Sequence, residues 1–184
     1  MLFLVVGPSG AGKDTLIDGA RAALAGDPGF RFVRRVITRP SGPGEDHEPV
    51  DAAEFARRRD AGGFALHWQA HRLDYGIPAD IAPDLAAGRA VVANVSRQVI
   101  AQAAGRYPVV VLEISAAPDV LARRLAGRGR ETPAQIADRL TRGVALPDGV
   151  PVRRVVNDDT PAQGVAAVVA ILRGLSGGRA GAIA

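Results

Sequence analysis

The feature that most constrains this chain is a glycine-rich segment near its start, GPSGAGKDTL, at residues 7–16. It fits the phosphate-binding loop pattern G-x-x-x-x-G-K-S/T at every defined position except the last, where Asp14 replaces a hydroxyl residue. In such a loop, successive backbone N–H groups point at the phosphates of a nucleotide, and the lysine ammonium reaches the transferring phosphoryl group. We therefore expect Lys13 to be catalytic. The residues expected to bind the phosphates of ATP are Gly7, Pro8, Ser9, Gly10, Ala11, Gly12, Lys13, Asp14 and Thr15.

The surroundings of this segment agree with a phosphate loop. Residues 2–6, LFLVV, form a short apolar run that is typical of a buried strand, and residues 14–25 carry apolar side chains at helical spacing. Lys13 is also the only lysine among the 23 basic residues of the chain, so lysine is present at the one position where the motif requires it. A strand, a glycine turn and a helix in this order predict a functional nucleotide site.

Length and composition limit the other possibilities. A chain of 184 residues suits one compact domain, and the absence of cysteine excludes disulfides and thiolate metal sites. The apolar runs are too short to cross a bilayer, and the first residues lack the basic start and length of a signal peptide. The net charge is +4, but the arginines are scattered and aromatic residues are few. We expect a cytoplasmic protein that binds neither nucleic acid nor membranes, and the sequence is silent on its oligomeric state.

Alternating strand-like and helix-like segments predict an α/β fold. Besides residues 2–6, the strands are expected at residues 32–38, 64–70, 90–95, 109–115 and 152–156. Helix starts are expected at Thr132 and Thr160, each in a TPAQ segment, and at Asp51, which forms a capping-box-like pair with Glu54. This alternation predicts a parallel sheet covered by helices on both faces, with the nucleotide at the carboxyl ends of its strands.

Residues 31–78 interrupt the alternation of strand and helix. Two strand candidates there flank one short helix and a Gly/Pro-rich loop, so we expect a small inserted lobe that folds over an acceptor. The rest of the single domain, residues 1–184, would be a core of about residues 1–30 and 79–175. The tail at about residues 176–184 is expected to be flexible.

Several further segments resemble the guanylate-kinase-like P-loop kinases, and the resemblance covers nearly the whole chain. It implies a three-layer P-loop kinase fold with an arginine-bearing lid at about residues 124–142. Besides GPSGAGK, the resemblance includes ITRP (37–40) followed by GE (44–45), which is similar to the acceptor-phosphate segment, and LDYG (73–76), which is similar to a tyrosine-glycine turn. RRLAGRGRE (123–131) and IADRL (136–140) are similar to the lid. VVND (155–158) is similar to the segment near the nucleotide base.

The resemblance assigns roles to individual residues. Arg39 would hold the phosphate of the acceptor, and Tyr75 would support it. The lid would contribute Arg124, Arg128 and Arg139, which would close on the polyphosphate as catalytic groups. Arginine suits these roles because its planar guanidinium binds phosphate oxygens with two parallel hydrogen bonds. For a single lid arginine, the alternative is a solvated position on a helix face.

Departures from the guanylate kinases concern the residues that would recognise a purine. Arg35 stands in the place of a serine, and Gln69 in that of the guanine-binding glutamate, so a pocket for a neutral purine edge becomes cationic. We expect Arg35 and Arg97 to contact a second phosphate of the acceptor. His47 is expected either to hydrogen-bond sugar hydroxyls or to be merely solvated in its polar loop.

The metal site is also altered relative to that family. The loop has gained a carboxylate at Asp14, and the strand that normally ends in aspartates has Asn94 instead. We interpret the two changes as compensatory: Asp14, with Asn94 or its waters, would hold the Mg²⁺ ion that separates the carboxylate from the phosphates. The alternative is that Asp14 only stabilises the start of the following helix.

This combination resembles the ribose 1,5-bisphosphate phosphokinases, relatives of the guanylate kinases that make 5-phosphoribosyl 1-diphosphate (PRPP) in phosphonate breakdown. The Lys-Asp ending of the loop, EDH (45–47), VSR (95–97) and RGRE (128–131) are similar to that family. The resemblance implies an ATP- and Mg²⁺-dependent phosphotransferase acting on a small phosphorylated sugar. The alternatives are a nucleoside monophosphate kinase and a non-catalytic scaffold that binds phosphorylated partners.

Overall fold

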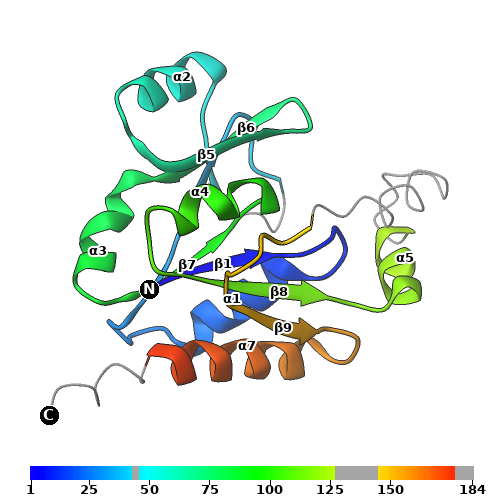
Figure 1. The fold of residues 1–184 in the computed structure, drawn as a ribbon. Coiled ribbons are helices and arrows are strands. Elements are labelled where there is room, and N and C mark those ends of the chain that lie inside the picture. Colours follow the sequence, from blue (N-terminus) through cyan, green and yellow to red (C-terminus); the bar gives the residue numbers. More distant parts are fainter. Residues whose placement is uncertain (43–45, 127–144, 177–184) are drawn as a thin grey trace, which may run out of the picture.

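The computed structural model describes residues 1–42, 46–126 and 145–176 (Figure 1). A five-stranded sheet forms the core, and its strands lie in the order β2-β7-β1-β8-β9, all parallel. This confirms the predicted α/β fold with a parallel central sheet. The core strands are β1 (Leu2–Val6), β2 (Phe30–Phe32), β7 (Ala90–Asn94), β8 (Val109–Ser115) and β9 (Val152–Val156).

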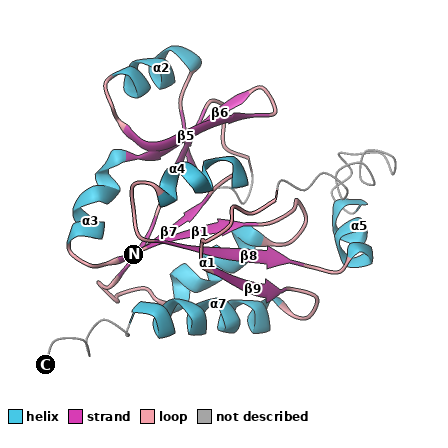
Figure 2. Ribbon diagram, in the orientation of Figure 1, coloured by secondary structure: helices cyan, strands magenta, loops and turns pink. Residues whose placement is uncertain are grey.

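The central strand β1 is buried on both faces, because helices cover the sheet from both sides (Figure 2). Leu2 and Leu4 pack on one side of the sheet, whereas Phe3 and Val5 pack on the other against α1 and α7. The helices around the sheet are α1 (Lys13–Ala23), α3 (Ala82–Ala86), α4 (Ile100–Ala104), α5 (Pro118–Ala126) and α7 (Pro161–Ser176), with short 3-10 turns η1 (Ala79–Ile81) and η2 (Arg97–Val99).

Two of the predicted helix starts are confirmed. The backbone N–H of Glu54 donates to Oδ1 of Asp51 at 2.7 Å, at the start of α2 (Ala52–Asp60). Before α7, Oε1 of Gln163 accepts from the backbone N–H of Thr160 at 3.2 Å and from its hydroxyl at 2.8 Å. The third expected start, at Thr132, lies outside the described residues.

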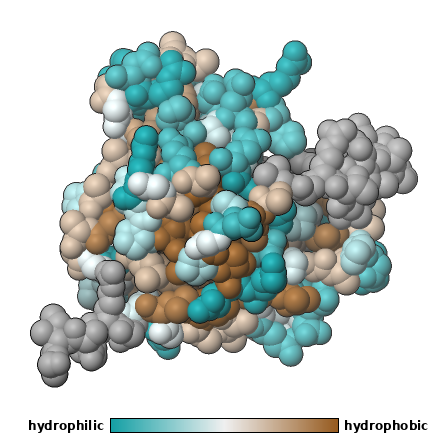
Figure 3. Space-filling model, viewed as in Figure 1, coloured by the Kyte–Doolittle hydropathy of each residue, from teal (hydrophilic) through white to brown (hydrophobic). Residues whose placement is uncertain are grey.

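A second sheet forms the inserted lobe. Its strands β4 (His47–Pro49), β3 (Arg35–Ile37), β6 (Leu73–Pro78) and β5 (Phe64–Ala70) lie in that order. Helix α2 lies at the far end of the lobe, and that end is largely hydrophilic in Figure 3. None of the helices among the described residues is long and apolar enough to cross a membrane.

Two expectations about the lobe are wrong. A single strand at residues 32–38 does not form: β2 ends at Phe32 beside β7, and the chain then crosses to the other sheet, where β3 pairs with β6. The sequence pattern could not show this change of sheet, because neither β2, which is half-buried throughout, nor β3, where Val36 and Ile37 are both buried, alternates buried and exposed residues. The expected tyrosine-glycine turn is part of strand β6. The lid and the tail fall almost entirely outside the described residues.

Candidate active site

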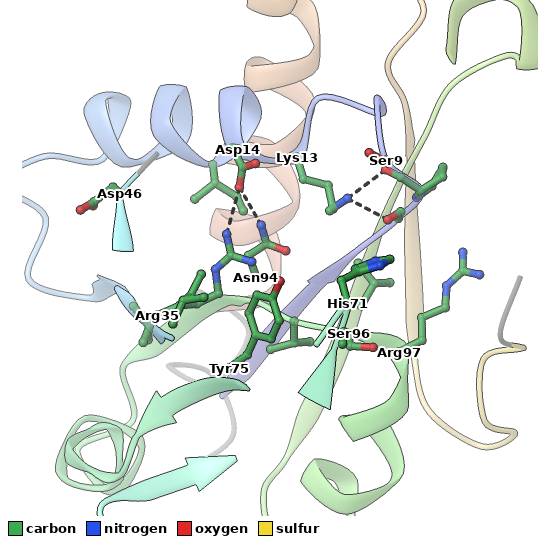
Figure 4. A pocket seen from close by; sticks show the side chains of 18 of the residues that line it. Ser9, Lys13, Asp14, Arg35, Asp46, His71, Tyr75, Asn94, Ser96 and Arg97 are labelled. Carbon is green, nitrogen blue, oxygen red and sulfur yellow. Dashed lines mark hydrogen bonds and ion pairs between the residues drawn. The ribbon is translucent and has the colours of Figure 1, made fainter. Parts of the chain in front are cut away.

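A cavity of about 720 Å³ lies beyond the carboxyl ends of β1 and β7, between the core and the lobe (Figure 4). Its walls come from the phosphate loop, from α1, from β3, from the turn between β5 and β6, and from the residues after β7. The carboxyl ends of parallel strands are where α/β proteins of this kind bind ligands. The predicted nucleotide loop and the predicted acceptor lobe therefore face one shared space.

The phosphate loop is held in a specific shape. Gly7 has no room for a side chain, because a Cβ there would lie 2.0 Å from the carbonyl oxygen of Ile114, and Gly12 starts α1 with φ at +85°. The Nζ atom of Lys13 donates to the carbonyl oxygens of Gly7 and Pro8 at 2.8 and 2.9 Å. A hollow of about 80 Å³ lies between the loop and the first residues of α1, where a phosphate-binding loop holds its anion.

The turn after β9 contacts the phosphate loop through a buried side chain. Asn157 is 5% exposed, and its Nδ2 donates to the carbonyl oxygen of Ala11 at 2.8 Å. The next residue, Asp158, accepts from the backbone N–H of Ala117 at 2.7 Å, just before α5. The family resemblance implies a place near the nucleotide base for this VVND segment, and the structure shows that it contacts the phosphate loop itself.

The two residues predicted to serve the metal lie together. Oδ1 of Asp14 accepts from Nδ2 of Asn94 at 2.7 Å and lies 3.5 Å from Nη2 of Arg35. The Asp14 side chain is 59% exposed at the cavity wall, whereas Asn94 is buried at the end of β7. Gly12 occupies the N-cap of α1, and no side chain caps it by a hydrogen bond. The hydrogen bonds of Asp14 therefore tie the loop to β7 and to the lobe.

A further set of charges on the same wall was missed from the sequence. Asp18 and Arg21 follow Asp14 at steps of four and three residues, which places all three on one face of α1, and all three line the cavity. Nη1 of Arg21 lies 2.8 Å from Oδ2 of Asp46, and Oδ1 of Asp46 lies 2.8 Å from Nε of Arg34. Burial raises the pKa of Asp18, while Arg21 opposes this shift and the neighbouring carboxylates reinforce it. The helical spacing from Asp14 was the available signal.

The predicted acceptor residues divide between the cavity wall and the interior. Arg39 and Tyr75 line the cavity, and the Tyr75 ring stacks on Trp68 with centroids 5.3 Å apart. His47 lies behind this wall: it is 1% exposed, and its Nε2 is 3.1 Å from the carbonyl oxygen of Arg39. The alternative expectation, a solvated His47, is wrong because the side chain is buried. Its placement suits support of the Arg39 backbone better than contact with a sugar hydroxyl.

Arg35 and Arg97 both line the cavity but lie on opposite sides of it (Figure 4). Nη2 of Arg97 donates to Oε1 of Glu113 at 2.7 Å, and the other oxygen of this carboxylate accepts from Arg154 at 2.8 Å. The structure therefore does not bring Arg35 and Arg97 together around one anion. Glu113 was not predicted, because its contact with Arg97 depends on the packing of β8 beside β1.

Of the lid arginines, only Arg124 lies within the described residues. Arg124 belongs to α5, whose Leu125 lies against the phosphate loop at Gly10. The Nη1 atom of Arg124 is buried and has no hydrogen-bond partner among the described residues. Arg128 and Arg139 fall outside the described residues. The roles of all three stay predictions.

Comparison with known proteins gives the family. No family model matches the chain. It is 54% identical over 171 residues to ribose 1,5-bisphosphate phosphokinase PhnN of Acidiphilium cryptum, an alignment that covers 93% of this chain and 91% of that protein. It is 55% identical over 174 residues, or 93% of its length, to the bifunctional ribose 1,5-bisphosphokinase-thymidine phosphorylase of Cupriavidus necator, of which it spans only 29%.

A solved structure supports the fold independently. Guanylate kinase from Anaplasma phagocytophilum superimposes with a TM-score of 0.66 at 21% identity, covering 96% of this chain and 85% of that one. At this identity the likeness concerns the fold alone, and it confirms the expected guanylate-kinase-like architecture. With the identity to the Acidiphilium protein over almost both full lengths, the comparisons show that the chain belongs to the ribose 1,5-bisphosphate phosphokinase family.

Proposed function

We propose that this protein transfers the γ-phosphoryl group of ATP to the 1-phosphate of ribose 1,5-bisphosphate, which yields PRPP and ADP. The observation that carries the proposal is the shared cavity, in which the phosphate loop with Lys13 faces Arg35 and Arg39 from the lobe. A kinase whose acceptor is itself a phosphate needs cations on both sides of one space. The names of the relatives support ribose 1,5-bisphosphate as that acceptor.

The chemistry requires positioning and charge stabilisation. An ionised oxygen of the acceptor 1-phosphate forms a bond to the γ-phosphorus, the bond from that phosphorus to the β–γ bridging oxygen breaks, and the electron pair leaves with ADP. No base is needed, because the attacking oxygen carries no proton. Lys13 stabilises the transferring group from the loop, and Arg39 orients the acceptor with a charged hydrogen bond.

The donors at Asp14 and Asn94 fit a magnesium ion. A carboxylate and an amide oxygen are hard ligands of the kind that Mg²⁺ prefers, and this ion commonly keeps several waters beside one or two protein ligands and the substrate phosphates. We infer that Asp14 holds the ion, directly or through water, with Asn94 orienting the carboxylate through its 2.7 Å hydrogen bond. The bound ion would neutralise charge on the nucleotide phosphates.

Arg35 favours a doubly phosphorylated acceptor over a nucleotide. It lies on β3 at the cavity wall, and its one ion pair among the described residues is the 3.5 Å contact with the half-exposed Asp14 carboxylate. A long ion pair of this kind is readily exchanged for a phosphate, which accepts two hydrogen bonds from a guanidinium. The edge of a neutral purine carries no negative charge to pair with the Arg35 guanidinium in this position.

An acceptor screen tests the proposal. With ATP and Mg²⁺, we expect kcat/KM for ribose 1,5-bisphosphate to exceed that for GMP, AMP or UMP by about 100-fold or more. The Lys13→Ala variant is the control, and its turnover with every acceptor should be lost because the ammonium at the loop is removed. Preference for a nucleoside monophosphate would replace the proposal by a nucleotide kinase, and binding of phosphorylated ligands without turnover would indicate a scaffold.

A further inference from the structure

The turn between β5 and β6 has an unusual backbone. Ala70 pairs with Leu73, so His71 and Arg72 alone form the turn, with φ angles of +52° and +62°. Among the described residues, these two are the only residues other than glycine with a positive φ. Two-residue hairpin turns of this shape are usually built from Asn-Gly or similar pairs, because a side chain is disfavoured in the left-handed region. The chain thus keeps two large side chains at positions that favour small residues.

The two side chains differ in where they lie. The imidazole of His71 lines the same cavity as Lys13 and Ser96, from the β5–β6 hairpin of the lobe (Figure 4). Arg72 is exposed and is not among the residues that line the cavity. Backbone strain of this kind is retained most often at binding and catalytic sites.

The imidazole is also available to a ligand. Two charged groups of the same cavity wall are engaged with the protein, Lys13 with two loop carbonyls and Asp14 with Asn94. Within the described part of the chain, the His71 ring makes no hydrogen bond or ion pair. A ring N–H therefore remains free to donate to a bound phosphate, unlike the ring of His47, which contacts the Arg39 backbone.

We propose that His71 is a further catalytic residue, whose ring N–H donates a hydrogen bond to an oxygen of the acceptor phosphate during transfer. This rests on the proposed function, because the acceptor phosphate must approach the γ-phosphate at Lys13, and His71 lines the cavity that Lys13 also lines. Negative charge is concentrated on the oxygens of both groups as they approach, and a preoriented donor stabilises it. His71 gains and loses no proton in this step; the electron pair still leaves with ADP.

A pair of glycine variants separates the imidazole from the turn. Glycine adopts a positive φ without strain, so both His71→Gly and Arg72→Gly should fold with a Tm at or above that of the native protein. We expect His71→Gly to lower kcat/KM for ribose 1,5-bisphosphate by about tenfold to 100-fold, because a hydrogen-bond donor to the reacting group is lost. Arg72→Gly, which changes the neighbouring residue of the same turn, should remain within about twofold of the native value.

Restoration of a donor completes the test. Added imidazole, or the His71→Asn substitution, which tolerates the left-handed backbone and keeps an N–H donor, should recover part of the activity. Unchanged activity in His71→Gly, or a loss that neither imidazole nor the asparagine substitution recovers, would overturn the proposal. If the native protein instead turns over GMP, the proposed function fails, and the same variants measured with GMP still decide the role of His71.

Discussion

Asp14 stands where phosphate loops have a hydroxyl, and its carboxylate lies at the wall of the cavity that would receive the nucleotide. Two like charges in direct contact repel, so a carboxylate at this position is tolerated beside phosphates only if a cation intervenes. Asn94 donates to one oxygen of this carboxylate at 2.7 Å and orients it, whereas the contact with Arg35 is longer, at 3.5 Å. The arrangement suits a metal ligand, and Asp14 is also the acidic residue of the first turn of α1, as the helix-stabilising alternative requires.

The Asp14→Asn variant tests this role. Removing the charge should raise the Mg²⁺ concentration for half-maximal activity by about tenfold or more, and should change Tm only slightly because the residue is exposed. Asp18→Asn is the matched control one turn further along α1, and its Mg²⁺ midpoint should stay in place. The double variant Asp14→Ser with Asn94→Asp should regain part of the lost affinity. A Mg²⁺ titration of Asp14→Asn that coincides with the native curve would exclude the metal role.

At the scale of elements, the phosphate loop depends on three neighbours for its shape. Strand β8 packs against the loop at Gly7, and α5 packs against it at Gly10. The turn after β9 binds the loop through the hydrogen bond of Asn157. Preorganised N–H groups bind phosphate strongly because they need not be reoriented when the nucleotide arrives. The contact after β9 is a hydrogen bond from one side chain, so a single substitution can remove it.

Substitution of that side chain should affect the nucleotide more than the acceptor. Asn157→Ala deletes a buried hydrogen bond of about 1 kcal/mol or more, so we expect KM for ATP to rise about fivefold to tenfold while KM for the acceptor stays near its native value. Val168→Ala in α7 is the control, because it opens space in the core on this side of the sheet and removes no side-chain hydrogen bond. A lowered Tm in both variants with KM for ATP unchanged in both would show that Asn157 contributes to stability only.

Elements with a local signal were predictable, and those fixed by distant contacts were not. Strand β1 and the first four residues of β8 are continuous apolar runs, and valines begin and end β9, so all three strands were located from their sequences. Strand β4 has three residues, one of them a proline, and no periodic pattern marks it. In the site, Lys13 and Asp14 follow from spacing within ten residues. The position of His71 depends on the pairing of β5 with β6, and that of Asn157 depends on its packing against the phosphate loop. Neither contact is visible in a local sequence pattern.

At the scale of the whole molecule, the cavity exists because two sheets are joined at an angle across the phosphate loop (Figure 1). Ion pairs span the junction: Arg21 of α1 pairs with Asp46 just before β4, and Asp14 of the loop meets Arg35 of β3. These contacts place the arginines of the lobe opposite the loop lysine. The central claim is that the space between them fits a sugar bisphosphate better than a nucleotide.

The most direct test gives the enzyme both acceptors at once. Equal concentrations of ribose 1,5-bisphosphate and GMP, with limiting ATP and Mg²⁺, would be followed by ³¹P NMR, which distinguishes a sugar 1-diphosphate that retains a 5-phosphate from a nucleoside diphosphate. The account predicts that the γ-phosphoryl group appears almost entirely as the 1-diphosphate of the sugar, with GMP unchanged. Accumulation of GDP while ribose 1,5-bisphosphate persists would contradict it.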